Sequence, residues 1–342
     1  MPVREVYQSQ TFLIACSGVA RQKMSPAKRR PQLVADRLVA DVGGTSTRLA
    51  LASGGNVLGD TAHTFRNDDF LSFEALLGVF TAKFATRPKQ AVVAAAGKPS
   101  LGSIRLTNRD WKISNQVFLS EGIEDVFFLN DLEALAYATN STTITFQGVH
   151  QCSPTGRQKL VVGIGTGFNL CPFQSIDRDR LLTFSSESGH MSLPSDITEV
   201  ANLDGGRVRT VEDLFSGRGF RRVIGSAAGY RIEDVDQSEQ VLKSNKGLAE
   251  RVFRLYGRAL GQLLRNLCAS HLPYGGVFLA GSVARRIFSE QIFVSELLAT
   301  PGNTILGDDW LPPISLFCQD DAALMGLATW EPVHADISDY RS

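Results

Sequence analysis

Two short segments of the chain share one pattern: an apolar run enters a turn of glycine and hydroxyl residues and leaves it as a second apolar run. The first is LVADVGGTSTRLAL at 38–51 and the second is KLVVGIGTGFNLCPF at 159–173. Each is typical of a strand, a turn and a strand, so the repeat predicts two lobes that begin with the same hairpin. A chain of 342 residues is also longer than one hydrophobic core usually spans.

Strand-length apolar runs alternate with segments of helical periodicity along the rest of the chain. This alternation predicts an α/β fold. The expected strands include NVLGDTAHTF, QAVVAAAG, DVFFLND and the start of GGVFLAGSVARRIF. The expected helices include DDFLSFEALLGVFTAKF, LEALAYAT, residues 247–272 and DDAALMGLATW.

The domain organisation follows from these elements and from two segments that lack periodicity. Residues 1–36 are basic and contain proline, which favours a flexible N-terminal arm. We expect a small α/β lobe over 37–141, completed by a C-terminal helix at about 319–333, a large lobe over 142–318, and a polar tail over 334–342.

Composition excludes several kinds of partner. The chain has 35 Lys and Arg against 35 Asp and Glu, so no net positive field favours nucleic acid or an anionic membrane. No apolar run is long enough to span a bilayer. Five scattered cysteines without a CxxC pair argue against a disulfide framework and a zinc site. We therefore expect a cytoplasmic protein whose partners are small molecules.

The first turn has the residues of a phosphate-binding loop. Gly43 and Gly44 allow backbone N–H groups to approach an anion closely, and Thr45 adds a hydroxyl donor. Asp41 at the end of the strand is suited to hold Mg²⁺ through a water molecule, because Mg²⁺ keeps most of its hydration shell. The structural alternative is an ordinary hairpin with a capping aspartate.

The second turn, with Gly165, Thr166 and Gly167, is a weak signal on its own. It does not open a helix, so a dinucleotide fingerprint is disfavoured. A further glycine, Gly281, follows the buried strand of GGVFLAGS and could pack against a nucleotide. Each motif alone is more often a structural turn, but two phosphate-type hairpins in one chain are more informative than either.

Two further motifs carry groups that suit a hydroxyl substrate. Asp131 follows Asn130 at a predicted boundary between a strand and a helix, where it is either a helix cap or a general base whose ionised form the helix favours. Glu187 and His190 lie three residues apart in the turn SESGH and suit the hydroxyls of a polyol. The alternatives for this turn are a solvated loop or a metal pair, and no third metal ligand has suitable spacing.

Taken in order, these motifs resemble the bacterial glucokinase family, which shares duplicated ribonuclease-H-like lobes with hexokinases, actin and Hsp70. The match runs in register from about residue 38 to residue 330. The resemblance implies two lobes of the actin and hexokinase type with an active-site cleft between them. The zinc-binding cysteine cluster of the related repressor and kinase group is absent from the sequence, which places the chain with the zinc-free branch.

The resemblance also implies a role for each motif. DVGGTSTRLAL resembles the phosphate-1 loop, GIGTGFN the phosphate-2 loop and GGVFLAGSVARR the adenosine motif. The segments LTNRDW, FLNDLEALAYA, ESGHMSLP and VEDLFSGRGF resemble the sugar-side motifs. They imply Asp131 as the general base and sugar contacts from Asn108, Asn130, Glu187, His190 and Glu212. ATP and Mg²⁺ are the implied cofactors, and a homodimer is the implied assembly.

Three positions depart from the family pattern, all in motifs on the nucleotide side. Ser46 stands where Asn is usual, Asn169 where Gly is usual, and Ser282 where Gly is usual. The predicted function is ATP-dependent phosphorylation of glucose to glucose 6-phosphate. Two alternatives stay open: a kinase for another hexose such as fructose, mannose or an amino sugar, and a sugar-binding sensor that has lost catalysis.

Overall fold

The computed structural model describes residues 34–332 apart from short gaps. The described ranges are 34–97, 99–100, 102–106, 109–177, 180–201, 208–301 and 310–332. Most of the predicted N-terminal arm and all of the predicted tail over 334–342 lie outside these ranges.

The first sheet is built around the predicted hairpin at 38–51. Its strands are β1 (Arg37–Val42), β2 (Ser46–Ser53), β3 (Asn56–Val57), β4 (His63–Arg66), β5 (Gln90–Ala95) and β9 (Asp125–Asn130). β1 and β2 are antiparallel, with Asp41 opposite Arg48, and β5 and β9 continue the sheet in parallel. The order is β3-β2-β1-β5-β9, with β4 paired to β2. Three short strands form a separate small sheet: β6 (Pro99–Ser100), β7 (Ser103–Arg105) and β8 (Lys112–Ser114).

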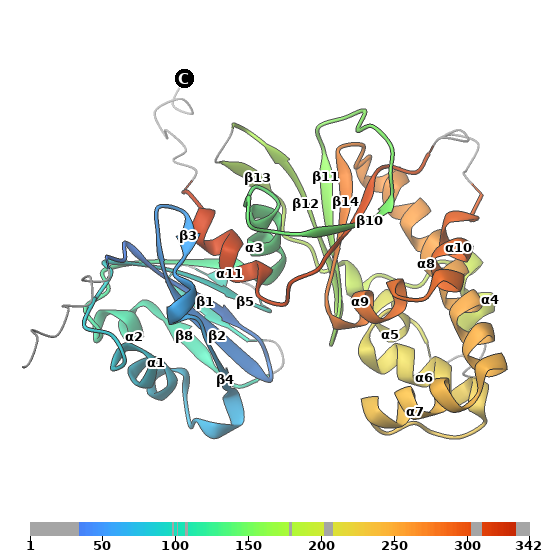
Figure 1. Ribbon diagram of the computed structural model, residues 1–342, viewed down its shortest axis with the longest axis horizontal. Coiled ribbons are helices and arrows are strands. Elements are labelled where there is room, and N and C mark those ends of the chain that lie inside the picture. Colours follow the sequence, from blue (N-terminus) through green and yellow to red (C-terminus); the bar gives the residue numbers. More distant parts are fainter. Residues whose placement is uncertain are drawn as a thin grey trace, which may run out of the picture. The chain divides into compact units, whose positions relative to one another are not determined.

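The second sheet repeats the arrangement of the first. Its strands are β10 (Phe146–His150), β11 (Lys159–Ile164), β12 (Phe168–Ser175), β13 (Leu181–Thr183), β14 (Gly276–Ala280) and β15 (Ile314–Phe317). The order β13-β12-β11-β14-β15 again places an antiparallel hairpin beside two parallel strands, and β10 is added at the edge. The predicted α/β class and the internal duplication are therefore confirmed (Figure 1).

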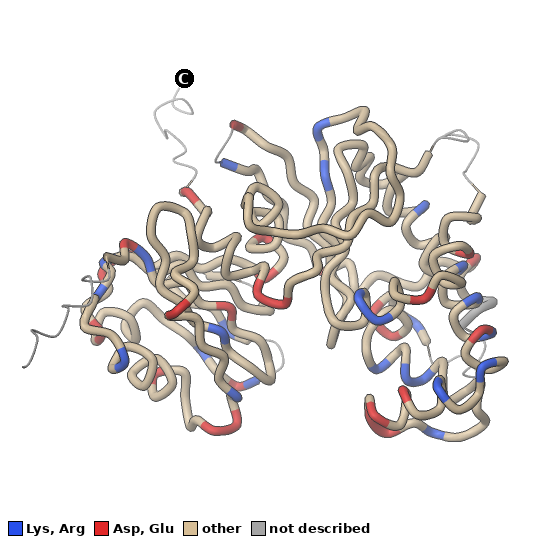
Figure 2. Tube along the Cα trace, in the orientation of Figure 1, with Lys and Arg blue, Asp and Glu red and all other residues tan. Residues whose placement is uncertain are grey.

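Helices and short 3-10 turns complete the described fold. The helices are α1 (Phe73–Thr81), α2 (Asn115–Leu119), α3 (Asp131–Ala138), α4 (Ser195–Ala201), α5 (Val211–Leu214), α6 (Gly217–Ala228), α7 (Val235–Ser244), α8 (Lys246–His271), α9 (Ser282–Phe288), α10 (Gln291–Leu298) and α11 (Ala322–Thr329). The 3-10 turns are η1 (Gly59–Thr61), η2 (Asn67–Asp69) and η3 (Ser188–His190). Figure 2 shows basic residues along α6, and in the sequence all of them are arginine. None of the described helices combines the length and apolar character needed to cross a bilayer.

The helices α3 and α11 pack together and contribute to a core that includes strands of both sheets. This core contains Val39 from β1, Leu327 from α11 and Val161 from β11. The two helices approach closely at Gly326, where an added Cβ would lie 1.8 Å from the carbonyl oxygen of Ala134. Any larger residue at 326 would push the two helices apart, so this contact requires glycine.

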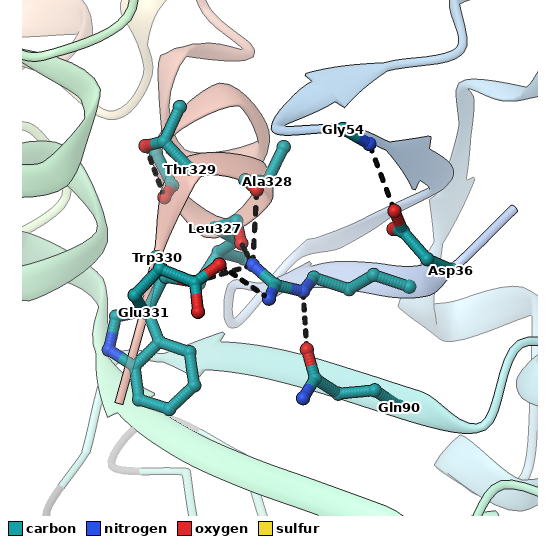
Figure 3. Close-up of polar contacts among 10 residues, drawn as sticks. Asp36, Gly54, Gln90, Leu327, Ala328, Thr329, Trp330 and Glu331 are labelled. Carbon is teal, nitrogen blue, oxygen red and sulfur yellow. Dashed lines mark hydrogen bonds and ion pairs between the residues drawn. The ribbon is translucent and has the colours of Figure 1, made fainter. Parts of the chain in front are cut away.

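Arg37 at the start of β1 ties α11 to the first sheet, and Figure 3 labels its hydrogen-bond partners Leu327, Ala328, Trp330 and Gln90. Its guanidinium donates to the carbonyl oxygens of Leu327 at 3.1 Å, Ala328 at 3.0 Å and Trp330 at 2.5 Å. Carbonyl groups at a helix C-terminus have no partner within the helix, and a buried cation both satisfies them and complements the helix dipole. Nε of Arg37 also donates to Oε1 of Gln90 on β5 at 2.6 Å. The C-terminal helix is thereby fixed to the sheet that carries Asp41.

Two predicted elements differ from the structure for local reasons. The helix predicted over 68–84 begins only at Phe73, because residues 67–69 form η2 and the hydroxyl of Ser72 accepts from the N–H of Ala75 as the helix cap. The strand predicted over 56–65 is divided into β3 and β4 by η1. There the buried hydroxyl of Thr61 donates to the carbonyl oxygen of Leu58 at 2.6 Å.

Candidate functional site

The turn between β1 and β2 presents backbone donors that could bind an anion. The N–H of Gly43 donates to the carbonyl oxygen of Ser46 at 2.9 Å and closes the hairpin. The N–H groups of Gly44 and Thr45 donate to no acceptor in the described part of the chain, and Thr45 is exposed. Consecutive free N–H groups in a glycine turn form the type of concavity that binds phosphate oxygens.

Two side chains that the motifs did not single out hold this turn in place. Asn67 is fully buried, and its Nδ2 donates to the carbonyl oxygens of Gly43 at 2.8 Å and Gly44 at 3.2 Å. The guanidinium of Arg109 donates to the carbonyl oxygens of Gly44 at 3.3 Å and Asn67 at 3.1 Å. It also lies over the ring of Trp111, 4.6 Å from the ring centroid. The carbonyl groups are therefore fixed on one side, which leaves the N–H groups for a ligand.

The turn between β11 and β12 has the same character. The N–H of Gly165 donates to the carbonyl oxygen of Gly167 at 3.0 Å, whereas Thr166 is exposed and its N–H has no acceptor among the described residues. Gly281, which precedes α9, packs directly on this turn. Its φ is +105°, and an added Cβ would lie 2.3 Å from the carbonyl oxygen of Ile164. Both observations require glycine at 281, and they bring the predicted adenosine and phosphate-2 motifs into contact.

The boundary between β9 and α3 positions the predicted base. Asn130, not Asp131, is the N-cap of α3: its Oδ1 accepts from the N–H of Leu132 at 3.0 Å, and its Nδ2 donates to the carbonyl oxygen of Gly97 at 3.2 Å. Glu133 completes the capping box, accepting from the N–H of Asn130 at 2.9 Å. Asn130 supplies the cap, and Oδ1 of Asp131 accepts from the same N–H of Leu132 at 3.0 Å.

Three carboxylates interact electrostatically at this boundary. Burial raises the pKa of Asp131 to about 6, and the negative charges of Asp41 and, more weakly, Glu187 act in the same direction, against the hydrogen bond from the N–H of Leu132. Burial also raises the pKa of Asp41, although Arg48, whose Nη1 lies 3.0 Å from Oδ2 of Asp41, opposes that shift. Charges on the first hairpin and on the SESGH turn therefore both act on Asp131.

The SESGH turn forms η3 and leaves its polar groups exposed. Glu187 and His190 are both accessible at the surface, while Ser188 and Gly189 between them are buried. Asn169 anchors the turn: its Nδ2 donates to the carbonyl oxygen of Ser186 at 2.6 Å, and its Oδ1 accepts from the N–H of Ser188 at 3.1 Å. Although Asn169 belongs to a motif predicted to bind the nucleotide, its side chain contacts the SESGH turn, which is predicted to bind the sugar.

Glu212 on α5 connects the SESGH turn with the turn between β11 and β12, the predicted second phosphate turn. Its Oε2 accepts from the N–H of Phe168 at 3.1 Å, and its Oε1 lies 3.2 Å from Nη2 of Arg218. An added Cβ at Gly167 would lie 2.6 Å from Oε2 of Glu212, and one at Gly189 would lie 3.4 Å from Cβ of Glu212. The glycine at 167 therefore makes room for this glutamate, whereas the glycine at 189 makes room for the carbonyl oxygen of Phe168.

A cavity of about 230 Å³ lies beside the second phosphate turn, between α6, α7 and α9. Its mixed apolar and polar lining and its position are suited to part of a nucleotide, and its volume is below that of pockets that enclose a whole drug-sized ligand. Arg286 forms one wall and is fixed by Glu239 at 2.5 Å and Glu290 at 2.6 Å. The lining residues are Gly165, Thr166, Gly217, Arg218, Phe220, Arg221, Val235, Ser238, Glu239, Ser282, Val283 and Arg286.

The carboxylate of Asp41, beside the first turn, fits a hydrated Mg²⁺. Oδ1 of Asp41 accepts no hydrogen bond from the described residues, whereas Oδ2 is paired with Arg48. The described ranges contain no group of three or more His, Cys, Asp or Glu side chains that could hold a metal ion. Mg²⁺ commonly binds through one or two carboxylates, water and substrate phosphates, so a single available carboxylate oxygen fits this ion.

The structure thus brings most of the predicted site residues to one region, although their functional roles stay predictions. Asn108 lies outside the described residues. Motif reading missed Asn67, Arg109 and the apolar and charged lining of the cavity. Neither Asn67 nor Arg109 lies in a periodic or glycine-rich pattern, so only the tertiary contacts identify them.

Comparison with known proteins adds a family match to this geometry. The family model described as Glucokinase matches residues 38–333, which is most of the chain. The curated glucokinase of Brucella melitensis is 27% identical over 317 residues, which cover 86% of this chain and 90% of that protein.

Solved structures of similar proteins show the same fold. A glucokinase from an Antarctic psychrotroph has a TM-score of 0.70 at 23% identity, covering 86% of this chain and 97% of its own. A ROK-family glucokinase from Streptomyces griseus, solved in complex with glucose and AMPPNP, has a TM-score of 0.58 at 17% identity. That match covers 85% of this chain and 97% of the other. These similarities confirm the predicted fold of two actin- and hexokinase-type lobes.

Proposed function

The chain belongs to the glucokinase family, and we propose that it transfers the γ-phosphoryl group of ATP to the 6-hydroxyl of glucose. The observation that carries the proposal is Asp131, a carboxylate at the start of α3 whose pKa is raised to about 6. A general base is most effective when its pKa lies near the working pH. The complex of a similar glucokinase with glucose and AMPPNP supports the choice of substrates.

The sugar would bind at the α3 boundary and the SESGH turn. The side-chain amide of Asn130 keeps one N–H beyond the hydrogen bond that it donates to Gly97, which suits a sugar hydroxyl. Glu187 and His190 are accessible on η3, and Glu212 lies against the same turn. The proposed sugar contacts are Asn108, Asn130, Glu187, His190 and Glu212, as the family resemblance implies.

The phosphates would bind between the two glycine turns. We assign the phosphate contacts to the backbone donors of Gly44, Thr45, Thr166 and Gly167 and the nucleoside to the cavity beside Gly281. Mg²⁺, held through water by Asp41, would neutralise charge on the phosphate oxygens.

In the reaction, Asp131 accepts the proton of the 6-hydroxyl as that oxygen forms a bond to the γ-phosphorus. The bond between the γ-phosphorus and the bridging oxygen to the β-phosphate breaks, and ADP leaves. Phosphoryl transfer depends mainly on positioning and charge neutralisation, so the small groups of the two turns suffice.

A coupled assay of ADP formation tests this proposal. The full chain is incubated with MgATP and, separately, glucose, fructose, mannose and glucosamine. The highest kcat/KM is expected with glucose. A higher value with another hexose would support the alternative of a different hexokinase, and saturable glucose binding without ADP formation would support the sensor.

A further inference from the structure

The cavity of about 230 Å³ beside Gly281, to which we assigned the nucleoside, is called the nucleotide cavity below. A second cavity, which we call the arginine cavity, lies beside it and has no role in the proposed transfer. It has a volume of about 570 Å³ and is formed by α6 and the segment that follows it as far as Glu233. Figure 2 shows the basic residues of α6. The charged residues that line the arginine cavity are Arg218, Arg221, Arg222, Arg231 and Glu233.

Three of the four arginines have partners among the described residues, and two of the three acids that act on them, Glu212 and Asp213, lie outside the lining. Arg231 pairs with Glu233 at 3.1 Å, and Arg218 pairs with Glu212, which lies outside the lining, at 3.2 Å. Arg222 donates to the carbonyl oxygen of Asp213 at 3.1 Å. Four guanidinium groups therefore share the cavity with a single carboxylate.

Arg221 has neither an ion-pair nor a hydrogen-bond partner in the described part of the chain. It is partly buried and lines both the arginine cavity and the nucleotide cavity. A guanidinium that has lost part of its hydration without gaining an acceptor is suited to bind an anion. Arginine also favours phosphate because its planar fork can donate two parallel hydrogen bonds to two oxygens.

We propose that the arginine cavity binds a phosphoryl group of a small phosphorylated anion while a nucleotide occupies the neighbouring cavity. Arg221 and Arg231 supply the charge, and Ser226 and Tyr230 line the remainder of the space. The same phosphoryl chemistry could come from the nucleotide itself or from a separate compound. We assign the phosphoryl group to a separate compound, because the lining continues past the end of α6 to Arg231 and Glu233, which do not line the nucleotide cavity.

The site also has a route to the sugar side. This consequence, like the nucleotide in the neighbouring cavity, rests on the proposed function. An anion that draws Arg218 into the cavity would compete with Glu212 for its guanidinium. Glu212 in turn accepts from the N–H of Phe168 beside the second phosphate turn. Bound phosphate is therefore expected to change the KM for glucose.

Calorimetric titration of the full chain with inorganic phosphate at low salt tests the site. The titration is made with and without saturating AMPPNP and Mg²⁺. We expect saturable binding in both conditions, weakened about tenfold or more by Arg221→Gln and by Arg231→Gln. Arg231 has an 84% exposed side chain, so its substitution is expected to leave the fold intact. Arg180→Gln is the matched control, because Arg180 also pairs with a nearby acid, Asp177, on the surface.

Three results would overturn the proposal: an absence of saturable binding, loss of phosphate binding when AMPPNP is present, or wild-type affinity in both variants. Loss with AMPPNP would mean that phosphate binds in the nucleotide cavity. The titration does not depend on catalysis. A failed hexose assay with the expected phosphate binding would therefore remove the proposed function and leave the arginine cavity in place.

Discussion

Asp41 at the end of β1 lies close enough to Asp131 at the start of α3 for its negative charge to raise the pKa of Asp131. The parallel pairing of β1 with β5 and of β5 with β9 brings the ends of these strands to one edge of the first sheet. Burial is the larger cause of the shift, and together the two effects bring the pKa to about 6. The pair thus couples the first phosphate turn to the proposed base.

The first prediction concerns the acid limb of the pH profile. Asp131 must be ionised to accept a proton, so kcat/KM for glucose should fall as the pH drops below about 6. Asp41→Asn removes a negative charge and should move the midpoint of this limb to lower pH, whatever its effect on the plateau rate. Asp60→Asn, an exposed aspartate on η1, is the control. An unchanged midpoint in Asp41→Asn would show that the charge of Asp41 does not affect the ionisation of Asp131.

The second prediction concerns stability. The pKa of Asp131 is about 6 in the folded protein and 3.8 as its ordinary value, so the folded state binds the proton more tightly. The contribution of Asp131 to the free energy of unfolding is therefore fully present below about pH 4 and is lost as the pH rises through about 6. Asp131→Asn should therefore increase the free energy of unfolding by about 1–3 kcal/mol at pH 7 and by little near pH 4.

Denaturant unfolding of wild type and Asp131→Asn at both pH values measures this difference, with Asp60→Asn again as the control. Equal or lower stability of the Asp131→Asn variant at pH 7 would show that the folded environment does not disfavour the charged form.

The features predicted correctly from sequence are those encoded by neighbouring residues. Both hairpins, the long helix α8 and the β9–α3 boundary follow from alternation, helical periodicity and glycine turns in single segments. The duplication is visible in the sequence because the hairpins at Asp41 and Gly165 have similar local patterns. The N-cap is harder to predict: Asn130 and Asp131 are both good capping residues, and only the hydrogen bonds show that Asn130 takes this role.

The features that were missed depend on distant residues. Asn67 looks like an ordinary loop residue, yet its burial and its hydrogen bonds to Gly43 and Gly44 make it the support of the first turn. The cavity beside Gly281 forms where α6 packs beside α7 and α9. No single segment contains that cavity, so a pattern read along the chain cannot predict it.

The third prediction concerns Asn67 as the support of the turn between β1 and β2. Asn67→Ala removes both hydrogen bonds to the turn. We expect kcat/KM for ATP to fall at least about tenfold, through a higher KM for ATP, a lower kcat or both. The KM for glucose should change much less. Asn56→Ala, an exposed asparagine in β3, is the matched control.

Arg109→Lys offers a second variant for the same turn, because lysine keeps the charge but cannot donate from two nitrogens of a planar fork. It should show a smaller loss in kcat/KM for ATP than Arg109→Ala. A loss confined to the KM for glucose in these variants would assign Asn67 and Arg109 to the sugar site instead.

The fourth prediction concerns Asn169. Asn169→Gly restores the usual family residue but removes the hydrogen bonds to Ser186 and Ser188. We expect the KM for glucose to rise several-fold, because the SESGH turn loses its anchor, and the KM for ATP to stay within about twofold. Steady-state kinetics with each substrate varied in turn measures both constants. A change in the KM for ATP alone would place the effect of Asn169 on the nucleotide side.

The most direct test of the central claim is the kcat of Asp131→Asn, measured together with glucose binding by calorimetry. Asparagine has nearly the same shape but cannot accept the proton, so kcat should fall by about 10²–10⁴-fold while the Kd for glucose stays within about tenfold. The fifth prediction is therefore a variant that binds glucose and scarcely turns it over. A kcat close to that of the wild type would contradict the assignment of Asp131 as the general base.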